Sequence, residues 1–386
     1  MTRVIHAITP GDHYSPRTGS AIPTVVNGLA AAANRDTGEP RFDQAVVLGR
    51  NTFMPRYDSA SAIEFSDVPA PSSGERIRDA VLARAAVPRS AAARYFRPLA
   101  EVLADEPPAF VLAHNAPILP WLLRNSPHTV VLYAHNDILR SVGHAEARRT
   151  LGTVSAIVCV SDFLAEQTRR HLPRSLRDRV RTVGNGVDCA QFQPRRDDES
   201  RHRLRVIFVG RMIELKGPDV LLAAAARLHR DDVEIVMVGS HGFDRDAPLT
   251  AYERRLRALA AASGVPVTFE PFSARDRLAE LLRSADVMVV PSRWQEPSGL
   301  TIGEGMACGL PVIASRVGGV PEVIGSAGIL IPSEDPQALA RSISELADNR
   351  ELRKRMGIDA RRHASDHDWS WAWAQLRGVL SELGSP

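Results

Sequence analysis

Short apolar runs alternate with longer amphipathic stretches along the whole chain, and this alternation constrains the fold more than any other feature. The apolar runs cover residues 3–9, 44–50, 109–115, 129–136, 156–161 and 180–186 in the first half, and 205–211, 233–240, 267–272, 286–292, 311–315 and 328–332 in the second. Their unbroken β-branched character is typical of strands buried on both faces. Strands that alternate with helices predict βα units, so we expect an α/β protein with two doubly wound parallel sheets.

Two domains also follow from the length of 386 residues, which exceeds the size at which a single core stops growing. The polar segment 191–203 lacks periodicity and is the best linker candidate. We therefore place the first domain at 1–193 and the second at 203–366, followed by an apolar, tryptophan-rich helix within 368–386. Ligands bind such sheets outside the carboxyl ends of the strands, so two facing sheets suggest a cleft between the domains.

The composition of the chain argues against several classes of function. The net charge is +3, and the basic residues are scattered among 45 acids, so a nucleic-acid-binding surface is not expected. The cysteines, Cys159, Cys189 and Cys308, are odd in number and lack CxxC spacing, which favours reduced structural thiols and no metal framework. With no secretory h-region and no run of 18 uncharged apolar residues, we expect a cytoplasmic protein. The basic segment 169–181 favours a solvated face, with contact to anionic lipid at the inner membrane face as the alternative.

One of only two lysines in the chain stands where a strand gives way to a helix. The remaining 46 basic residues are arginines, yet Lys216 follows Gly210 and Arg211 and precedes a Gly-Pro helix start. An arginine fork beside a compact ammonium group could hold two linked phosphates. The GxGxxG and Walker A fingerprints are absent, which disfavours NAD chemistry, although the loop ending at Gly19 and Ser20 could offer backbone N–H groups to an anion.

A second dense segment covers residues 291–324 and carries two carboxylates eight residues apart. Glu296 lies in a Pro-Ser-Gly turn, and Glu304 lies on the helix that this turn opens. At a rise of roughly 1.5 Å per residue the two are separated by about 10 Å, the scale of a nucleotide sugar. Carboxylates accept hydrogen bonds from vicinal hydroxyls, and the helix start at 299–301 directs free N–H groups between them.

These segments together resemble family-4 retaining glycosyltransferases with the GT-B fold. The E-x7-E pair Glu296 and Glu304, followed by GMACGLPVIAS, is similar to the signature of that family, and Arg211 with Lys216 matches its phosphate-binding pair. Further matches are Gly19-Ser20, His135 in LYAHND, Ser161 in VCVSDFL and residues 185–188 in VGNGVD. The loop GSHGFD, followed by YERRLRAL, is similar to a bacterial polysaccharide and spore-coat-like subset.

The resemblance implies two Rossmann-like domains facing a cleft, with a nucleotide-diphosphate sugar held mainly by the C-terminal domain and the acceptor by the N-terminal one. The C-terminal helix 368–386 would return to the N-terminal domain. Arg211 and Lys216 would neutralise the departing diphosphate without a metal ion. Glu304 would bind the ribose, Glu296 the donor-sugar hydroxyls, and His135 would reach the sugar from across the cleft. No carboxylate is placed as a nucleophile, so the leaving phosphate oxygen would help to deprotonate the acceptor.

The expected catalytic set is His135, Glu296, Arg211 and Lys216. The expected donor site comprises Gly19, Ser20, Gly210, Arg211, Lys216, Glu296, Ser298, Gly299, Leu300, Thr301 and Glu304. His114 and Asn115 are candidates for acceptor contact. Ser298 stands where the family more often has phenylalanine, which predicts a smaller and more polar wall at the donor sugar. No metal site and no cofactor are expected.

The function expected from these features is retaining transfer of a hexose from a nucleotide-diphosphate sugar, with UDP-hexose the first choice, to a hydroxyl acceptor that is a saccharide or a lipid-linked saccharide. The pathway would be bacterial polysaccharide or glycoconjugate synthesis. Two alternatives stay open: a GT-B nucleotide-sugar epimerase, and a non-catalytic subunit that binds a sugar nucleotide. NAD-dependent oxidoreduction is a more distant third.

Overall fold

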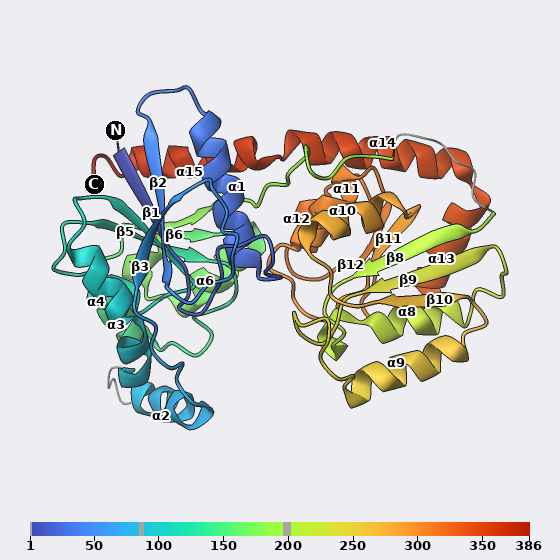
Figure 1. Cartoon of the computed structure of the whole chain (residues 1–386), viewed down its shortest axis with the longest axis horizontal. Coiled ribbons are helices and arrows are strands. Elements are labelled where there is room, and N and C mark those ends of the chain that lie inside the picture. Colours follow the sequence, from blue (N-terminus) through green and yellow to red (C-terminus); the bar gives the residue numbers. More distant parts are fainter. Residues whose placement is uncertain (1, 85–88, 196–201) are drawn as a thin grey trace. The chain divides into compact units, whose positions relative to one another are not determined.

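The computed structural model describes residues 2–84, 89–195 and 202–386, and it divides into two compact units (Figure 1). Unit 1 consists of Met1–Asn185 together with Trp369–Pro386, and unit 2 consists of Gly186–Asp368. Each unit has its own parallel sheet, so the predicted pair of doubly wound α/β sheets is confirmed.

The sheet of unit 1 has seven parallel strands in the order β3-β2-β1-β4-β5-β6-β7. The strands are β1 (Thr2–Ala7), β2 (Phe42–Gly49), β3 (Ser61–Phe65), β4 (Phe110–His114), β5 (Thr129–Ala134), β6 (Ala156–Cys159) and β7 (Val180–Thr182). Six of them overlap the predicted runs, although β1 and β2 begin one and two residues earlier than predicted. The edge strand β3 was not predicted, because most of its residues are exposed and it lacks the apolar run of a strand covered on both faces.

The helices of unit 1 cover both faces of this sheet (Figure 1). They are α1 (Ala21–Arg35), α2 (Ser73–Arg84), α3 (Ser90–Ala104), α4 (Leu119–Leu122), α5 (His144–Leu151), α6 (Asp162–His171), α7 (Arg174–Arg177) and α15 (Trp369–Glu382). The C-terminal helix α15 packs against α1: a Cβ atom on Gly28 would lie 2.2 Å from the indole of Trp369, so only glycine leaves room there. Trp373 donates a hydrogen bond to Asp36 (2.8 Å) and contacts Phe42 edge-on.

The sheet of unit 2 has six parallel strands in the order β10-β9-β8-β11-β12-β13. The strands are β8 (Leu204–Val209), β9 (Val233–Val238), β10 (Val267–Glu270), β11 (Val287–Val290), β12 (Val312–Ser315) and β13 (Ile329–Ile331). Alternate residues of β8 enter opposite cores: Val206 and Phe208 join one apolar cluster, and Ile207 joins the other. This period of two explains why the strand is apolar at consecutive positions from Val206 to Val209.

The helices of unit 2 form two layers, one on each face of its sheet (Figure 1). The layers comprise α8 (Pro218–Ala225), α9 (Ala251–Ala261) and α13 (Pro336–Asp348) on one face, and α10 (Arg275–Arg283), α11 (Leu300–Ala307), α12 (Val320–Ile324) and α14 (Arg350–Asp366) on the other. The predicted boundary after residue 193 differs from the one observed, which falls between Asn185 and Gly186. The reason is Phe192, which is fully buried in the core of unit 2 and whose carbonyl accepts a hydrogen bond from Arg361. Residues 196–201 of the predicted linker lie outside the described residues.

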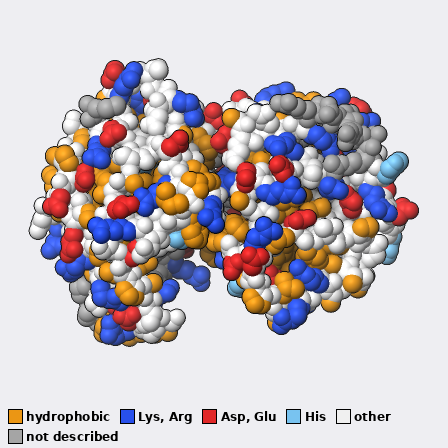
Figure 2. Space-filling view, in the orientation of Figure 1, with side chains coloured by type: hydrophobic (Ala, Val, Ile, Leu, Met, Phe, Trp, Pro, Cys, Tyr) orange, Lys and Arg blue, Asp and Glu red, His pale blue; other side chains and the backbone are white. Residues whose placement is uncertain are grey.

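The described surface carries mixed charges (Figure 2), and the cysteines are free thiols. On the face shown in Figure 2, basic and acidic side chains are interspersed over the described surface of each unit. All three cysteines are free, and burial raises the pKa of Cys159 to about 11 and the pKa of Cys308 to about 12, so both stay protonated thiols. Among the described helices, none combines the length and apolar character needed to span a bilayer.

Candidate functional site

In unit 2, an ion pair joins two of the predicted site residues at the carboxyl ends of β8 and β11. The short helix η1 (Glu214–Lys216) follows β8 and ends at Gly217, whose φ of +66° favours glycine. A Cβ atom on Gly217 would lie 2.0 Å from the carbonyl oxygen of Pro291, so this loop packs directly on the end of β11. Lys216 Nζ consequently lies 2.5 Å from Glu296 Oε1, and the hydroxyl of Ser292 donates to the same oxygen (2.8 Å).

The backbone of Glu296 is held by the Gly-Gly turn that precedes α12. The amide of Gly319 donates to the Glu296 carbonyl (2.7 Å), and the amide of Gly318 donates to the Gln295 side chain (2.8 Å). Gly318 has a φ of +55°, and a Cβ atom there would lie 2.2 Å from the Glu296 carbonyl oxygen. These contacts fix the direction of a carboxylate that is only 5% exposed.

Glu304 lies on α11, one turn inside the helix that opens at Gly299. Its Oε1 accepts a hydrogen bond from Arg275 (2.6 Å), whereas its Oε2 is buried and has no hydrogen-bond partner among the described residues. The residue is 3% exposed. A buried carboxylate oxygen without a donor is costly, so this atom marks a place where a ligand donor fits.

The other predicted donor residues of unit 2 line the same strand ends. Arg211 is exposed just after β8, and the amide of Gly210 donates to Val238 on β9 (3.0 Å). Ser298 is buried, Gly299 is the N-cap residue with a φ of +89°, and Leu300 and Thr301 form the partly exposed first turn of α11. Within the described part of the chain, neither Arg211 nor Glu304 shares a hydrogen bond or ion pair with Lys216 and Glu296.

In unit 1, the loop after β1 ends at Gly19 and Ser20, and α1 begins at the next residue. Ser20 is the N-cap residue, but its hydroxyl hydrogen-bonds the side chain of Asp12 and does not cap the helix. Desolvation by burial raises the pKa of Asp12, although the Ser20 hydrogen bond and the nearby His13 oppose the increase. Asp12 was not among the predicted site residues, since its one signal in the sequence is an acidic residue among the glycines and prolines of the loop.

His135 follows β5 and is held from two sides. Its backbone amide donates to Asn115 Oδ1 (2.8 Å), and Asn115 itself has a φ of +51°. The ring Nε2 of His135 lies 2.7 Å from Nδ1 of His114. Burial lowers the pKa of His135 to about 3, so the ring is neutral at physiological pH and is suited to hydrogen bonding more than to proton abstraction.

The expectation that His114 contacts an acceptor was wrong. The residue is 0% exposed, and both ring nitrogens are already occupied, one by His135 and the other by His6. A ligand therefore cannot reach its polar atoms. Asn115 is partly exposed, and its side-chain oxygen accepts a hydrogen bond from the backbone of His135; contact between Asn115 and an acceptor stays a prediction.

Comparison with known proteins identifies the family. Residues 191–363 match the family model for glycosyl transferases group 1, and residues 53–191 match the model for glycosyltransferase family 4. The chain is 34% identical to spore coat protein SA of Bacillus subtilis over 286 residues, which is 68% of this chain and 75% of that protein. The chain belongs to the family-4 glycosyltransferases.

Other relatives of this family-4 chain match over a shorter stretch. A D-inositol 3-phosphate glycosyltransferase of Acidothermus cellulolyticus is 39% identical over 222 residues, 53% of this chain and 48% of that enzyme. One from Streptomyces bingchenggensis is 34% identical over 60% of this chain and 54% of that enzyme. The match thus spans about half the length of these curated relatives.

Solved structures share the GT-B fold of this family-4 glycosyltransferase. HepE of Anabaena in complex with UDP-glucose superposes with a TM-score of 0.73 at 17% identity, covering 99% of this chain and 100% of that one. Sucrose-phosphate synthase of Thermosynechococcus elongatus superposes with a TM-score of 0.74 at 21% identity, covering 99% of both chains. The predicted GT-B class, with two Rossmann-like domains, is confirmed.

The structure adds residues to the site of this family-4 chain that the sequence analysis missed. Ser292 lies four residues before Glu296 and shares its Oε1, but a serine in a loop gives little signal alone. Arg275 precedes Glu304 by 29 residues and reaches it from α10, so only the fold brings them together. Among the described residues, no group of three His, Cys, Asp or Glu side chains could hold a metal ion.

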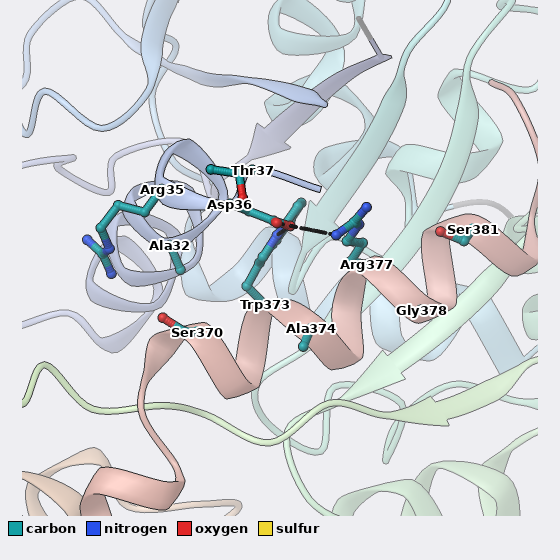
Figure 3. Close-up of a pocket in the computed structure, with 10 residues that line it drawn as sticks. All are labelled: Ala32, Arg35, Asp36, Thr37, Ser370, Trp373, Ala374, Arg377, Gly378 and Ser381. Carbon is teal, nitrogen blue, oxygen red and sulfur yellow. Dashed lines mark hydrogen bonds and ion pairs between the residues drawn. The ribbon is translucent and has the colours of Figure 1, made fainter. Parts of the chain in front are cut away.

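A separate cavity of about 630 Å³ lies between α1 and α15 in unit 1 (Figure 3). It is lined by the C-terminal end of α1, so it is at the opposite end of that helix from Gly19 and Ser20. Figure 3 shows Asp36 directed toward Trp373 and Arg377, and both donate hydrogen bonds to its carboxylate (2.8 and 3.0 Å). These polar groups satisfy one another, and the cavity is distinct from the ligand edge of the sheet.

Proposed function

We propose that the protein is a retaining, metal-independent hexosyltransferase that takes its sugar from a nucleotide diphosphate, with UDP-hexose the preferred donor. The acceptor is a hydroxyl group in bacterial polysaccharide or glycoconjugate synthesis. The observation that carries this proposal is the buried Oε2 of Glu304, a carboxylate oxygen without a donor beside the opening turn of α11. A nucleotide ribose supplies a hydroxyl donor of the required kind.

The diphosphate end of the donor has two cations in unit 2. Lys216 is paired with Glu296 in the absence of ligand, and the exposed Arg211 is available to the outer phosphate oxygens. When the sugar leaves, negative charge grows on the diphosphate, and Lys216 and Arg211 would stabilise it where it develops. The N–H groups of Leu300 and Thr301 at the start of α11 add donors to the same anion.

In unit 2, the hexose would be held by Glu296 and the buried Ser298. Both side-chain contacts of Glu296 fall on Oε1, so Oε2 can accept from sugar hydroxyls. Ser298 makes the wall at this point small and polar. The neutral ring of His135 offers a hydrogen bond and carries no charge, which suits an uncharged sugar.

The relatives support the donor class without assigning it to this chain. HepE of Anabaena was solved with UDP-glucose, and two bacterial relatives are named D-inositol 3-phosphate glycosyltransferases. The family resemblance implies that the transferred sugar retains its anomeric configuration. In the same-face mechanism a leaving phosphate oxygen takes the acceptor proton, the C–O bond to phosphate breaks, and the new C–O bond to the acceptor forms on the same face of the sugar.

A thermal-shift panel tests the proposal. UDP, GDP, ADP and TDP and their common nucleotide sugars are each added with and without EDTA. A ligand that binds the folded state raises the unfolding temperature. A uridine compound should give the largest shift, unchanged by EDTA. A preference for GDP-mannose would refute only the choice of donor, whereas no shift with any nucleotide sugar would refute the function.

Product analysis separates the alternatives. A donor-only incubation that isomerises the nucleotide sugar would indicate an epimerase. Biological activity unchanged in Glu296→Ala would indicate a binding subunit. An α product from an α-linked donor, identified by NMR of the anomeric proton, is the expected result.

A further inference from the structure

A row of four polar side chains crosses the sheet of unit 1 inside the core. Gln44 lies on β2, His6 on β1, His114 on β4, and His135 directly after β5, and these four strands are consecutive neighbours in the sheet. The contacts are Gln44 Oε1 to His6 Nε2 (3.1 Å), His6 Nδ1 to His114 Nε2 (3.0 Å) and His114 Nδ1 to His135 Nε2 (2.7 Å). Their exposed fractions are 3%, 0%, 0% and 7%, so only the last ring approaches the surface.

The protonation of the row follows from burial. Desolvation lowers the pKa of His6 to about 4 and the pKa of His135 to about 3, and it holds the pKa of His114 well below its usual value. All three rings are neutral at physiological pH. A neutral imidazole has one N–H donor and one lone pair, so a row of such rings can run in only one of two directions.

Gln44 selects the direction. Its amide nitrogen donates to the carbonyl of Phe42 (3.4 Å), which turns its oxygen toward His6. His6 must therefore carry its proton on Nε2 and accept at Nδ1 from His114. His114 in turn accepts at Nδ1 from the Nε2–H of His135. One amide thus assigns the tautomers of three rings, and the remaining lone pair of the row is at Nδ1 of His135.

We propose that Gln44, His6 and His114 are positioning residues, which hold His135 as the Nε2–H tautomer so that its Nδ1 accepts a hydrogen bond from a hydroxyl group of a sugar ligand. This role rests on the proposed function. It differs from simple core packing, because the direction of the row matters: in the reverse direction Gln44 would lose its hydrogen bond to the Phe42 carbonyl, and His135 would present an N–H group in place of a lone pair. Only the direction assigned by Gln44 presents an acceptor, which suits a hydroxyl donor and rejects a substituent that cannot donate.

The first test reads the tautomers directly. Long-range ¹H–¹⁵N NMR spectra of histidine-labelled protein distinguish Nε2–H from Nδ1–H rings. In the ligand-free protein, the three buried rings should all be Nε2–H. A buried ring protonated on Nδ1 would overturn the proposed direction, and this result does not depend on any ligand.

The second test breaks the row at its buried end. In Gln44→Leu the three rings should show mixed tautomers, and the Kd for UDP-glucose should rise about tenfold, the loss expected for one hydrogen bond. Val46→Ala is the matched control, since Val46 is buried on the same face of β2 two residues further on and touches no member of the row through a hydrogen bond. It should lower the unfolding temperature but keep the tautomers and the Kd.

The outcomes separate the two proposals. UDP-glucose should shift the Nδ1 resonance of His135 in the wild type and in Val46→Ala. Mixed tautomers in Gln44→Leu with an unchanged Kd would overturn the positioning role while leaving the proposed function standing. Failure of UDP-glucose to bind the wild type, with no other nucleotide sugar binding in the thermal-shift panel, would refute the proposed function and with it the contact to sugar.

Discussion

Replacing Lys216 with methionine removes one charge from the ion pair of unit 2 and keeps most of the side-chain volume. Lys216 Nζ lies 2.5 Å from Glu296 Oε1, and the two side chains are 27% and 7% exposed. Without the ammonium group, the hydroxyl of Ser292 is the one side-chain partner that the Glu296 carboxylate keeps among the described residues. The variant therefore leaves a nearly buried anion without a counter-charge.

The expected loss lies between two limits. Breaking a fully buried pair costs about 3–5 kcal/mol, and breaking an exposed one costs about 0–1 kcal/mol. Because about a quarter of the Lys216 side chain is exposed, we expect Lys216→Met to lower the free energy of unfolding by about 2 kcal/mol, or the unfolding temperature by roughly 4–8 °C for a domain of this size. In transfer assays, loss of a cation at the leaving group should reduce kcat about 100- to 1,000-fold.

A double variant separates the two effects. Lys216→Met combined with Glu296→Gln removes the uncompensated anion, so the unfolding temperature should recover while kcat stays low. Lys354→Met is the matched control, since Lys354 is the other lysine of the chain and is exposed on α14; it should change neither quantity. Calorimetry and initial rates with UDP-glucose measure both. A single variant that loses stability but keeps its transfer rate would refute the phosphate role of Lys216.

Three further outcomes follow from the structure. Gly318 has a φ of +55°, so Gly318→Ala should lower the free energy of unfolding by at least about 2 kcal/mol. As a control, Gly378→Ala on the exposed face of α15 should leave the stability unchanged or raise it. Equal denaturant midpoints for the two variants would contradict this prediction. Arg275→Met should raise the Kd for UDP about tenfold by releasing Glu304, whereas Arg277→Met, an exposed pair on the same helix, should not, as calorimetric titration would show. Burial lowers the pKa values of His6, His114 and His135, so the unfolded chain binds protons at these residues at a higher pH than the folded chain does. The free energy of unfolding should therefore fall as pH drops from about 6.5 toward 4, with a slope of up to about 4 kcal/mol per pH unit. A denaturation profile that is flat over that range would be inconsistent with neutral buried rings.

The fold was predictable because strands covered on both faces need apolar residues throughout. The segment from Val206 to Val209 in β8 is an example, since alternate residues enter different cores and a polar residue there would be costly. The exposed edge strand β3 carries no such requirement and left no signal. The predicted domain boundary lies later in the chain than the observed one, because the sequence around Phe192 is polar although the Phe192 side chain belongs to the core of unit 2.

Candidate site residues could be predicted where a short segment carries several of them. Glu296 and Glu304 stand eight residues apart in one turn and helix, so spacing alone indicated a pair of carboxylates. Arg275 comes from a different helix, and His6 comes from a strand 108 residues before His114, so their contacts depend on the sheet order. His114 shows the converse, since it lies at a strand end, as ligand-binding residues do, but its ring points into the core.

The polar groups at the strand ends are charged in unit 2 and neutral in the histidine row of unit 1. This difference matches the chemistry proposed for each unit. Unit 2 keeps charged groups at its strand ends, with Lys216 against Glu296 and Arg275 against Glu304. In unit 1, burial removes charge from the histidine row and leaves neutral donors and acceptors of fixed direction. A diphosphate needs cations that can exchange one anionic partner for another, whereas a sugar hydroxyl needs an oriented lone pair with no net field.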